Sequence, residues 1–583
     1  MQPFMTKPVI YQLLPRLFGN RNDHCVPGGT IEQNGSGKLA DITPKVLRSL
    51  RDLGVTHVWL TGVIEHTQQT DYSAYGIRRD NPYVVKGRAG SPYAIKDYYD
   101  IDPDIAVDVP ERMAEFEATV RRVHDAGMKV IIDFVPNHVA RQYHSDSRPA
   151  GAPSDFGTLD DTTKFFSPRN NFYYIPNQRF APSIPLGTGA DEYIEFPAKA
   201  TGNDCFTAFP GVNDWYETVK LNYGIDYGDG TRHFNPIPDT WMKMLHILLY
   251  WASKGVDGFR CDMAHMVPLE FWQWAIRQVK SDYPDIIFIA EIYDVDLYRP
   301  YIHTGGFDYL NDKVNLYDTL RDIQTHNHSA ARLTDCWQRL GDLGPHMLNF
   351  LENHDEQRFA SPQYAGNAYV ATPSLTVAAT LGTGAMMIYA GQELGEKGAD
   401  AEGFSGVDGR TTIFDYWSIP TLRRWLQSGA PSMTRMTREE RELRKQYATL
   451  LNLCNSEAAI REGVMFDLMY VNLSNPRFDP HRQFAYLRHA SGSTLLIAVN
   501  FGDKPADMAI NIPAHAFDFL GIAPGDRTAT DLLTGDTQTI HFTDEKPAEV
   551  SVAAHGAVIL RLEKASVSPE VKPEEKTPNK KAK

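Results

Sequence analysis

Three acidic side chains, Asp262, Glu291 and Asp355, follow short apolar runs of the sequence. Each run has the length and composition of a buried β-strand, and each acid stands where that strand would end. A pair of carboxyl groups can cleave a glycosidic bond, because one protonates the leaving oxygen while the other attacks the sugar or stabilises its developing positive charge. These acids are therefore candidates for catalysis of this kind.

The neighbours of two of these acids predict different roles for them. Arg260 lies two residues before Asp262, so strand alternation turns both side chains to one face, and the positive charge is expected to keep Asp262 ionised. Glu291 follows the apolar stretch Ile-Phe-Ile-Ala. These apolar neighbours and the nearby carboxylates are expected to raise the pKa of Glu291 toward that of a proton donor. We predict Asp262 as nucleophile and Glu291 as general acid/base. Asp133, inside an apolar strand, is expected to pair with Arg260.

Eight apolar runs in the first two thirds of the chain predict the strands that position these side chains. They are Val9–Leu13, His57–Leu60, Val130–Val135, Gly258–Asp262, Ile286–Ala290, Phe307–Tyr309, Leu348–Leu351 and Ala385–Tyr389. Helical patterns separate several of them, namely Arg112–Ala126, Trp241–Ser253, Glu270–Ser281 and Leu375–Leu381. The alternation predicts an α/β fold, a (β/α)8 TIM barrel, in which the carboxyl ends of the strands converge on one mouth.

A long segment interrupts this alternation after the third strand. Residues 139–238 separate that strand from the next helix, far more than the usual two to six residues of such a loop. The segment is rich in Pro, Gly, Asn and aromatic residues, as in FFSPRNNFYYIPNQRFAPSIP. We predict an inserted subdomain of irregular structure that overhangs the carboxyl mouth of the barrel.

The last part of the chain has a different pattern. A helix at Arg438–Leu453 is opened by a capping box at Thr437 and Glu440. Short strands follow at Phe484–Arg488, Thr494–Asn500, Asp507–Ile512 and Ala557–Leu562, which predicts a C-terminal antiparallel β-sandwich. The predicted division is barrel domain A at 1–138 and 239–455, inserted subdomain B at 139–238, β-sandwich domain C at 456–563 and a disordered, charged tail at 564–583.

Composition excludes several classes of function. Lys and Arg total 58 against 73 Asp and Glu, and the net charge of -15 argues against a nucleic-acid partner. The cysteines show no paired spacing, which predicts buried thiols in a reducing compartment; they are Cys25, Cys205, Cys261, Cys336 and Cys454. The sequence shows neither a signal-peptide pattern nor a run of about 18 apolar residues. We expect a cytoplasmic protein with no membrane partner, its oligomeric state left open.

Four of these stretches together resemble a known family. DFVPNH, GFRCD, the Glu after FIA, and ENHD are similar to the four ordered signature regions of the α-amylase family, glycoside hydrolase family 13. SPYAIKDY near residue 93 and YAGQE near residue 391 are similar to further stretches of that family. The resemblance covers about residues 5–455, and four motifs in order on successive predicted strand ends make coincidence very improbable.

The resemblance implies a role for each matched residue. Asp262 would form a covalent glycosyl intermediate, Glu291 would protonate the leaving group and then activate water, and Asp355 would hold sugar hydroxyls. The implied substrate-binding residues are Tyr93, which would stack beneath the sugar, His138 and His354, which would donate hydrogen bonds to it, and Arg260.

Three departures from the family pattern affect what is expected. Many members bind a structural calcium through the residue equivalent to Asn137 and a carboxylate, but Lys220 stands at the carboxylate position, so we expect neither this calcium nor any other cofactor. A metal bound by other oxygens stays open. His265 and Met266 replace a Lys-His pair that contacts the sugar beyond the scissile bond. Gly90 replaces an Asp of exo-acting α-glucosidases, which favours an amylase with an open donor side.

The expected function is that of a retaining glycoside hydrolase, a starch-type glycosidase that cleaves mainly α-1,4 bonds in α-glucans or malto-oligosaccharides. One alternative is a transglycosylase or an α-glucosidase of the same family that acts on short α-glucosides, since the same residues serve both reactions. A second alternative is a non-catalytic barrel used for binding. The presence of all three acids argues against it.

Overall fold

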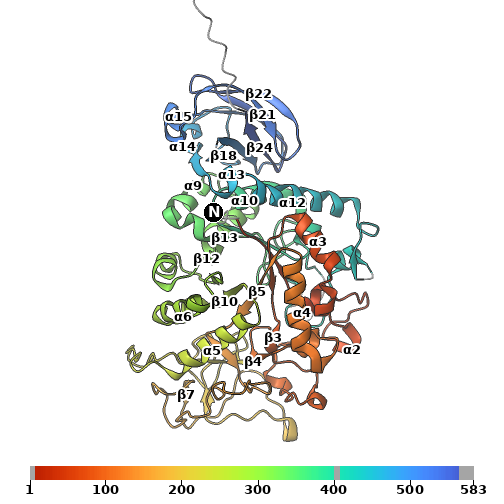
Figure 1. Cartoon of the computed structure of the whole chain (residues 1–583), viewed down its shortest axis with the longest axis vertical. Coiled ribbons are helices and arrows are strands. Elements are labelled where there is room, and N and C mark those ends of the chain that lie inside the picture. The colour runs from red at the N-terminus through yellow and green to blue at the C-terminus, as the bar shows by residue number, and fades with distance from the viewer. Residues whose placement is uncertain (1–6, 400–406, 428, 491, 564–583) are drawn as a thin grey trace, which may run out of the picture.

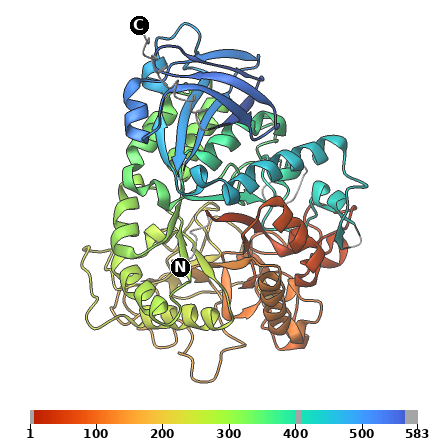
Figure 2. The ribbon, with the colours of Figure 1, turned by 45° about the horizontal axis from the view of Figure 1, so that its top comes forward.

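The computed structural model describes residues 7–399, 407–427, 429–490 and 492–563. The C-terminal sheets lie at one end of the molecule, the barrel lies in the middle, and the segment inserted after the third barrel strand lies at the other end (Figure 1). The turned view shows the same order (Figure 2). The predicted disordered tail at 564–583 lies outside the described residues.

The barrel is closed by eight parallel strands. Their order around the barrel is β1, β14, β13, β12, β11, β10, β5 and β2. The bounds are β1 Val9–Leu13, β2 His57–Leu60, β5 Lys129–Phe134, β10 Gly258–Cys261, β11 Ile287–Ala290, β12 Tyr309–Asn311, β13 Met347–Asn349 and β14 Ala385–Tyr389. All eight predicted strands are confirmed. β1, β2 and β14 have the predicted bounds, and the others are shifted by one or two residues.

Helices surround the barrel because its strands are apolar on both faces. Val130, Ile131 and Ile132 of β5 are all fully buried, so this strand packs inward and outward at once. The predicted helices are found as α4 Arg112–Asp125, α5 Asp239–Ser253, α6 Leu269–Asp282 and α10 Thr372–Thr380. Trp251 of α5 and Trp272 of α6 are fully buried members of the core that joins helices and barrel.

The inserted segment has little regular structure. Strand β6 (His138–Ala140) pairs with β9 (Thr218–Lys220), and β7 (Tyr174–Ile175) pairs with β8 (Ala198–Lys199). The β6–β9 pair starts from the end of the third barrel strand, so both ends of the insertion return to the barrel mouth. A small separate core fills the segment, with members that include Phe180, Tyr193 and Tyr216. The division of the chain at residues 138, 238 and 455 stays a proposal.

The C-terminal region is antiparallel, as predicted. Helix α12 (Arg438–Ser456) begins with the predicted capping box, in which Glu440 N–H donates to Thr437 Oγ1 at 3.1 Å and Thr437 N–H donates to Glu440 Oε2 at 2.9 Å. A six-stranded sheet has the order β17 (Val464–Asp467), β18 (Gln483–Ala490), β19 (Ser493–Asn500), β24 (Gly556–Leu562), β21 (Gly525–Asp531) and β22 (Thr537–Phe542). A second sheet pairs β20 (Ala506–Ile510) with β23 (Ala548–Val552).

The cysteines and the helices bear on two further predictions. All five cysteines are free thiols; three are buried, whereas Cys25 and Cys205 are half-buried, so the prediction of burial was wrong for these two. Both lie in loops rather than in the strands and helices that form the core.

Among the described residues, no helix combines the length and the apolar character that a membrane crossing requires.

Candidate active site

One guanidinium group lies at the centre of the site. Arg260 is fully buried on β10, directly opposite Asp133 of β5 in the strand register. Its Nη1 lies 3.2 Å from Asp133 Oδ1 and 2.9 Å from Asp262 Oδ1, and its Nη2 lies 2.6 Å from Glu291 Oε1. Three carboxylates from three neighbouring strands therefore meet around one positive charge. The predicted pairing of Asp133 with Arg260 is confirmed.

Short contacts hold the Glu291 carboxylate in place. Asp262 and Glu291 directly follow β10 and β11. The residue after Asp262, Met263, has a φ of 43°, a left-handed conformation that costs a residue with a side chain about 1–3 kcal/mol. This turn aims the Met263 N–H at Glu291 Oε2, 2.8 Å away, while Tyr293 Oη donates to Glu291 Oε1 at 2.6 Å. Each oxygen of Glu291 thus has a fixed donor.

Asp355 is oriented by an aromatic pair. His354 Nε2 lies 3.1 Å from Asp355 Oδ2 and 2.5 Å from Tyr93 Oη. The His354 and Tyr93 rings are stacked, with centroids 5.1 Å apart and an interplanar angle of 24°. On the other side of the imidazole, Gln12 Nε2 of β1 lies 2.7 Å from His354 Nδ1. Tyr93 and Gln12, which are distant in the sequence, therefore fix the ring that faces Asp355.

The electrostatics differ from the sequence-based expectation. Burial, together with the charge of Glu291, raises the pKa of Asp262 well above its ordinary value, although Arg260 acts in the opposite direction. Arg260 thus favours the ionised form of Asp262, as expected, but its one positive charge is shared among three carboxylates. Burial also raises the pKa of Asp133. The cluster is thus suited to hold a proton, which acid catalysis requires.

Two other groups of the site have shifted pKa values. Asp355 is partly desolvated at the cavity, which opposes its ionisation, but His354 and Arg260 outweigh this effect and lower the pKa of Asp355 to about 2. Burial, and then the neighbouring ammonium of Lys220, lowers the pKa of His138 to about 3, so its ring is neutral at pH 7. A neutral imidazole can donate a hydrogen bond to an uncharged sugar without a cost for burying charge.

These side chains face one cavity of about 260 Å³. Its lining includes Tyr93, His138, Asp262, Glu291 and Asp355, which are distant in the chain. Arg260 and His354 do not line it, but they contact acids that do. The structure therefore brings together all three predicted catalytic acids and two of the four predicted substrate-binding residues at the cavity surface.

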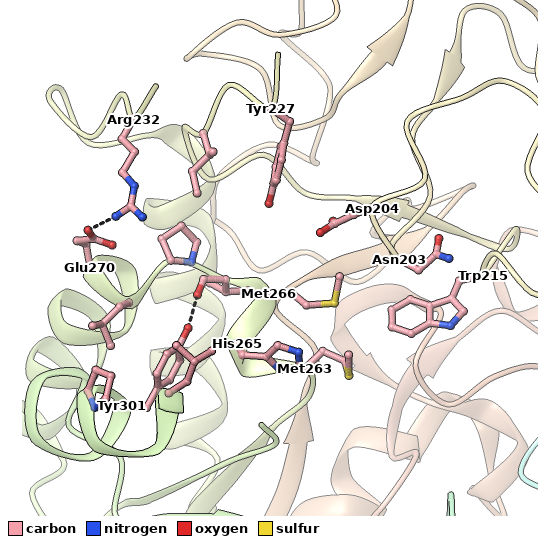
Figure 3. Close-up of a pocket in the computed structure, with 16 residues that line it drawn as sticks. Asn203, Asp204, Trp215, Tyr227, Arg232, Met263, His265, Met266, Glu270 and Tyr301 are labelled. Atoms are coloured by element: carbon pink, nitrogen blue, oxygen red, sulfur yellow. Dashed lines mark hydrogen bonds and ion pairs between the residues drawn. The ribbon is translucent and has the colours of Figure 1, made fainter. Parts of the chain in front are cut away.

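A larger cavity of about 750 Å³ adjoins the first, and Trp215 and Met263 line both. Figure 3 shows the larger cavity. His265 and Met266, the residues that depart from the family pattern, line this second cavity. Figure 3 shows Trp215 with Asn203 and Asp204 at one side and the ion pair of Arg232 and Glu270, 2.6 Å apart, at the other. The barrel mouth thus has a small compartment at the acids and a larger one beside them.

Sequence reasoning missed several residues of the site. Trp215 comes from the irregular insertion and has a positive φ of 35°. No periodicity marks such a position. Lys86 and Glu217, joined by an ion pair of 3.0 Å, close another part of the small cavity. Tyr293, two residues after Glu291, and Met263, one after Asp262, could have been found from their nearness to the acids in the sequence.

The ammonium group of Lys220 lies at the position where many family members bind calcium. Lys220 Nζ lies 2.5 Å from Asn137 Oδ1, 2.7 Å from Asp204 Oδ1 and 3.3 Å from the carbonyl oxygen of Met266. Lys220 is 2% exposed, and burial lowers its pKa. A divalent cation does not fit among these oxygens, because the ammonium already contacts each of them and would repel a second positive charge.

The fold and the site together define a class, the (β/α)8 barrels that gather carboxyl groups at the carboxyl ends of their strands. The family profile described as "Alpha amylase, catalytic domain" matches residues 12–182 and 235–461, more than half of the chain. The chain belongs to the α-amylase family. The resemblance seen in the sequence motifs is therefore confirmed.

Individual relatives are distant. The chain is 25% identical to alpha-amylase MalA of Haloarcula japonica over 545 residues, which are 92% of this chain and 62% of that protein. It is 22% identical to a cyclomaltodextrinase of Geobacillus thermopakistaniensis over 543 residues, 90% of this chain and 74% of that protein. A 29% identity over 332 residues, 52% of each chain, is found with an alpha-1,4-glucan:maltose-1-phosphate maltosyltransferase of Cereibacter sphaeroides. The chain thus spans less than two thirds of the length of MalA.

Solved structures share the whole architecture. The alpha-amylase of Geobacillus thermoleovorans complexed with acarbose has a TM-score of 0.61 at 19% identity, over 97% of this chain and 100% of that one. The noncanonic maltogenic alpha-amylase AmyB of Thermotoga neapolitana has a TM-score of 0.59 at 20% identity, over 95% and 98%. At these identities the likeness shows the fold alone.

Proposed function

We propose that the chain is a retaining glycoside hydrolase that cleaves α-glucosidic bonds, mainly α-1,4, in starch-type glucans or malto-oligosaccharides. The observation that carries the proposal is the meeting of Asp262, Glu291 and Asp355 on the wall of one cavity. The names of relatives, among them alpha-amylase and cyclomaltodextrinase, support the choice of α-glucans.

In the proposed reaction Asp262 attacks the anomeric carbon while Glu291 gives its proton to the glycosidic oxygen. The bond between that carbon and oxygen breaks, its electron pair stays with the oxygen, and a glycosyl ester forms on Asp262. Glu291 then removes a proton from water, whose oxygen attacks the same carbon and frees Asp262. Each step inverts the anomeric centre, so the α-configuration is retained.

The position of Arg260 favours this retaining course over an inverting one. Its two terminal nitrogens contact Asp262 and Glu291 at 2.9 and 2.6 Å, so one guanidinium bridges both acids. Inverting enzymes hold their two carboxyl groups about 6.5–9.5 Å apart to admit a water between sugar and base, whereas retaining enzymes hold them about 5–5.5 Å apart. A shared guanidinium draws the pair toward the shorter separation.

Other side chains are proposed to bind the sugar at the acids. Asp355, kept ionised by His354, would accept hydrogen bonds from two hydroxyls. Tyr93 would present its ring face to the sugar and neutral His138 would donate to it. No calcium at Asn137 and Lys220 is part of this proposal, because the ammonium group already links the insertion to the barrel there.

The backbone near Gly90 favours an amylase over a strict α-glucosidase. Gly90 has a φ of 74°, and a Cβ at this position would lie 1.6 Å from the carbonyl oxygen of Thr67. The acid that caps the non-reducing end in exo-acting relatives therefore has no place at residue 90 in this backbone. We propose action on oligosaccharides rather than on terminal glucose alone.

Transglycosylation is the second candidate, and the cavity of about 750 Å³ beside the acids favours it. That volume lies within the range of about 300–1,000 Å³ typical of ligand sites, so it has room for an acceptor sugar. A sugar hydroxyl in place of water would take the glycosyl group from Asp262. Hydrolysis and transfer then differ only in which oxygen reaches the intermediate.

Incubation with maltoheptaose tests both candidates. Chromatography is expected to show maltose- to maltohexaose-sized products that first appear as α-anomers by proton NMR, and Asp262→Asn is expected to abolish them. Products longer than the input would identify transfer as a main activity. Absence of products from the wild-type chain, or first appearance of the β-anomer, would overturn the retaining assignment.

A further inference from the structure

Three buried carboxylates form a second acidic cluster, away from both cavities. Strand β3 (Ile64–His66) pairs with β4 (Ile95–Ile101), and Glu65 lies opposite Asp97 in the register. Asp100 follows on β4. Glu65 and Asp97 are 0% exposed and Asp100 is 2% exposed, and one oxygen of each lies within 4.8 Å of the others. None of the three lines either cavity described above.

Two members of the cluster have hydrogen-bond donors. Asp100 accepts from Arg112 Nε at 2.8 Å and from Ser147 Oγ at 2.5 Å. Asp97 accepts from the N–H groups of Tyr99 at 2.8 Å and Ser147 at 3.0 Å. Their carboxylates are therefore fixed in place, and the same segment at Ser147 reaches both.

Glu65 is different, because neither of its carboxylate oxygens accepts a hydrogen bond. A buried carboxylate without donors is costly, by several kcal/mol if it stays charged. The neighbouring ammonium, Lys96 Nζ, is 3.5 Å away and is shared with Asp80 at 3.4 Å and with the carbonyl oxygen of Arg78. Lys96 alone therefore does not satisfy Glu65.

The charges around Glu65 do not balance. Four carboxylates lie together, those of Glu65, Asp80, Asp97 and Asp100, and the cations that contact them are Lys96 and Arg112. With every group ionised, two negative charges stay uncompensated in a buried region. One divalent cation would neutralise them, and the oxygens of Glu65 that lack donors would become its ligands.

We propose that Glu65, Asp97 and Asp100 bind a divalent, oxygen-preferring cation of the calcium class. Calcium–oxygen distances of about 2.3–2.6 Å allow ligand oxygens to lie up to about 5 Å apart across the ion, which agrees with the spread of these atoms. The ion would join the two strands of the β3–β4 ribbon, because Glu65 lies on β3 and both aspartates lie on β4. The site shares no residue with the Lys220 contacts.

The rival explanation is a protonated Glu65, and Glu65→Gln separates the two. Glutamine has the shape of protonated glutamic acid, so the change would be nearly neutral if no metal binds. The matched control is Asp125→Asn, an exposed acid at the end of α4 that undergoes the same change of charge. Asp97→Asn is a second variant in case Glu65→Gln does not fold.

The full-length proteins are dialysed against calcium chloride, then against cation-free buffer, and measured by elemental mass spectrometry and thermal unfolding. We expect about one calcium per chain in the wild type and the control, and less than a tenth of that in Glu65→Gln or Asp97→Asn. Added calcium should raise Tm of the wild type and of the Asp125→Asn control, but not Tm of Glu65→Gln or Asp97→Asn. A wild type without bound metal, or equal calcium in Glu65→Gln and the wild type, would overturn the proposal. These readouts do not depend on glycosidase activity.

Discussion

Nη2 of Arg260 lies 2.6 Å from Oε1 of Glu291, the carboxyl group proposed as the proton donor. The other terminal nitrogen of the same guanidinium contacts Asp262, the proposed nucleophile, and Asp133. A fully buried charge on a fixed strand thus contacts three acids at once. The sequence analysis predicted the contacts with Asp262 and Asp133 but not the contact with Glu291.

Replacement of this guanidinium should change the pH profile of the reaction. Lysine in Arg260→Lys keeps the charge but contacts fewer of the acids, so at least one carboxyl loses its stabilising cation and its pKa rises. The acid limb of the kcat/KM profile is expected to move to higher pH, and kcat/KM to fall about 10²–10³-fold. Arg444→Lys is the control, since Arg444 forms a buried ion pair with Glu393 at 2.8 Å that lines neither cavity. An unchanged acid limb would contradict this prediction.

Glu291→Gln should slow the protonation of the leaving group. We expect kcat on maltoheptaose to fall about 10²–10⁴-fold with Tm almost unchanged. An aryl α-glucoside with a strongly acidic phenol needs no proton donor, so its release should be affected much less. Asp262→Asn should lose activity on both substrates. If Glu291→Gln lowered kcat equally on both substrates, Glu291 would not be the general acid.

Asp355 should stay ionised throughout the working pH range, because its pKa is lowered to about 2. Its folded pKa is lower than the unfolded value, so its contribution to stability is present above about pH 4 and is lost as the pH falls through about 2. Asp355→Asn is expected to lower kcat/KM about 10²-fold, and by the same factor at every pH from 5 to 8. A shift of the acid limb in this variant would show that Asp355 itself titrates there.

Lys220 can be tested by restoring a carboxylate. Lys220→Ala leaves the oxygens of Asn137 and Asp204 without their ammonium and should reduce the free energy of unfolding by about 3–5 kcal/mol. Lys220→Asp should lose similar stability without calcium and regain part of it when calcium is added. Both changes are made in a Glu65→Gln background, so that calcium at the other proposed site does not contribute. Equal calcium responses of the two variants would contradict the prediction.

Trp215→Ala should affect acceptor binding more than chemistry. Trp215 lines both cavities, so a sugar on either side of the scissile bond would contact its ring. Loss of the ring is expected to raise KM for maltoheptaose about 5- to 10-fold, in line with about 1 kcal/mol per aromatic contact, and to lower the ratio of transfer to hydrolysis. Phe209→Ala, which removes an exposed ring of the insertion, is the control. A fall in kcat with unchanged KM would place Trp215 in a different role.

The sequence by itself determined the barrel and the list of acids. Runs such as Ala385–Tyr389, and Val130–Val135 apart from Asp133, are apolar on both faces, as is typical of a parallel sheet covered by helices, so the spacing and length of the runs predicted the barrel. Asp262 and Glu291 could be found because a polar group at the end of a buried strand has no packing reason to be there, and Asp355 because it ends the ENHD stretch after the seventh predicted strand. The helix at Arg438 was predictable because its capping box is local in the chain.

Only the tertiary structure decided how the acids interact. Arg260 is 31 residues from Glu291 in the numbering, and no local rule shows that one guanidinium contacts three carboxylates from three strands. Trp215, Lys86 and Glu217 reach the site from irregular segments, whose path depends on long-range contacts rather than on periodicity. The buried cluster at Glu65 depends on the pairing of two short strands separated by a loop. Charge interactions follow distance in space, and closure of the barrel sets that distance.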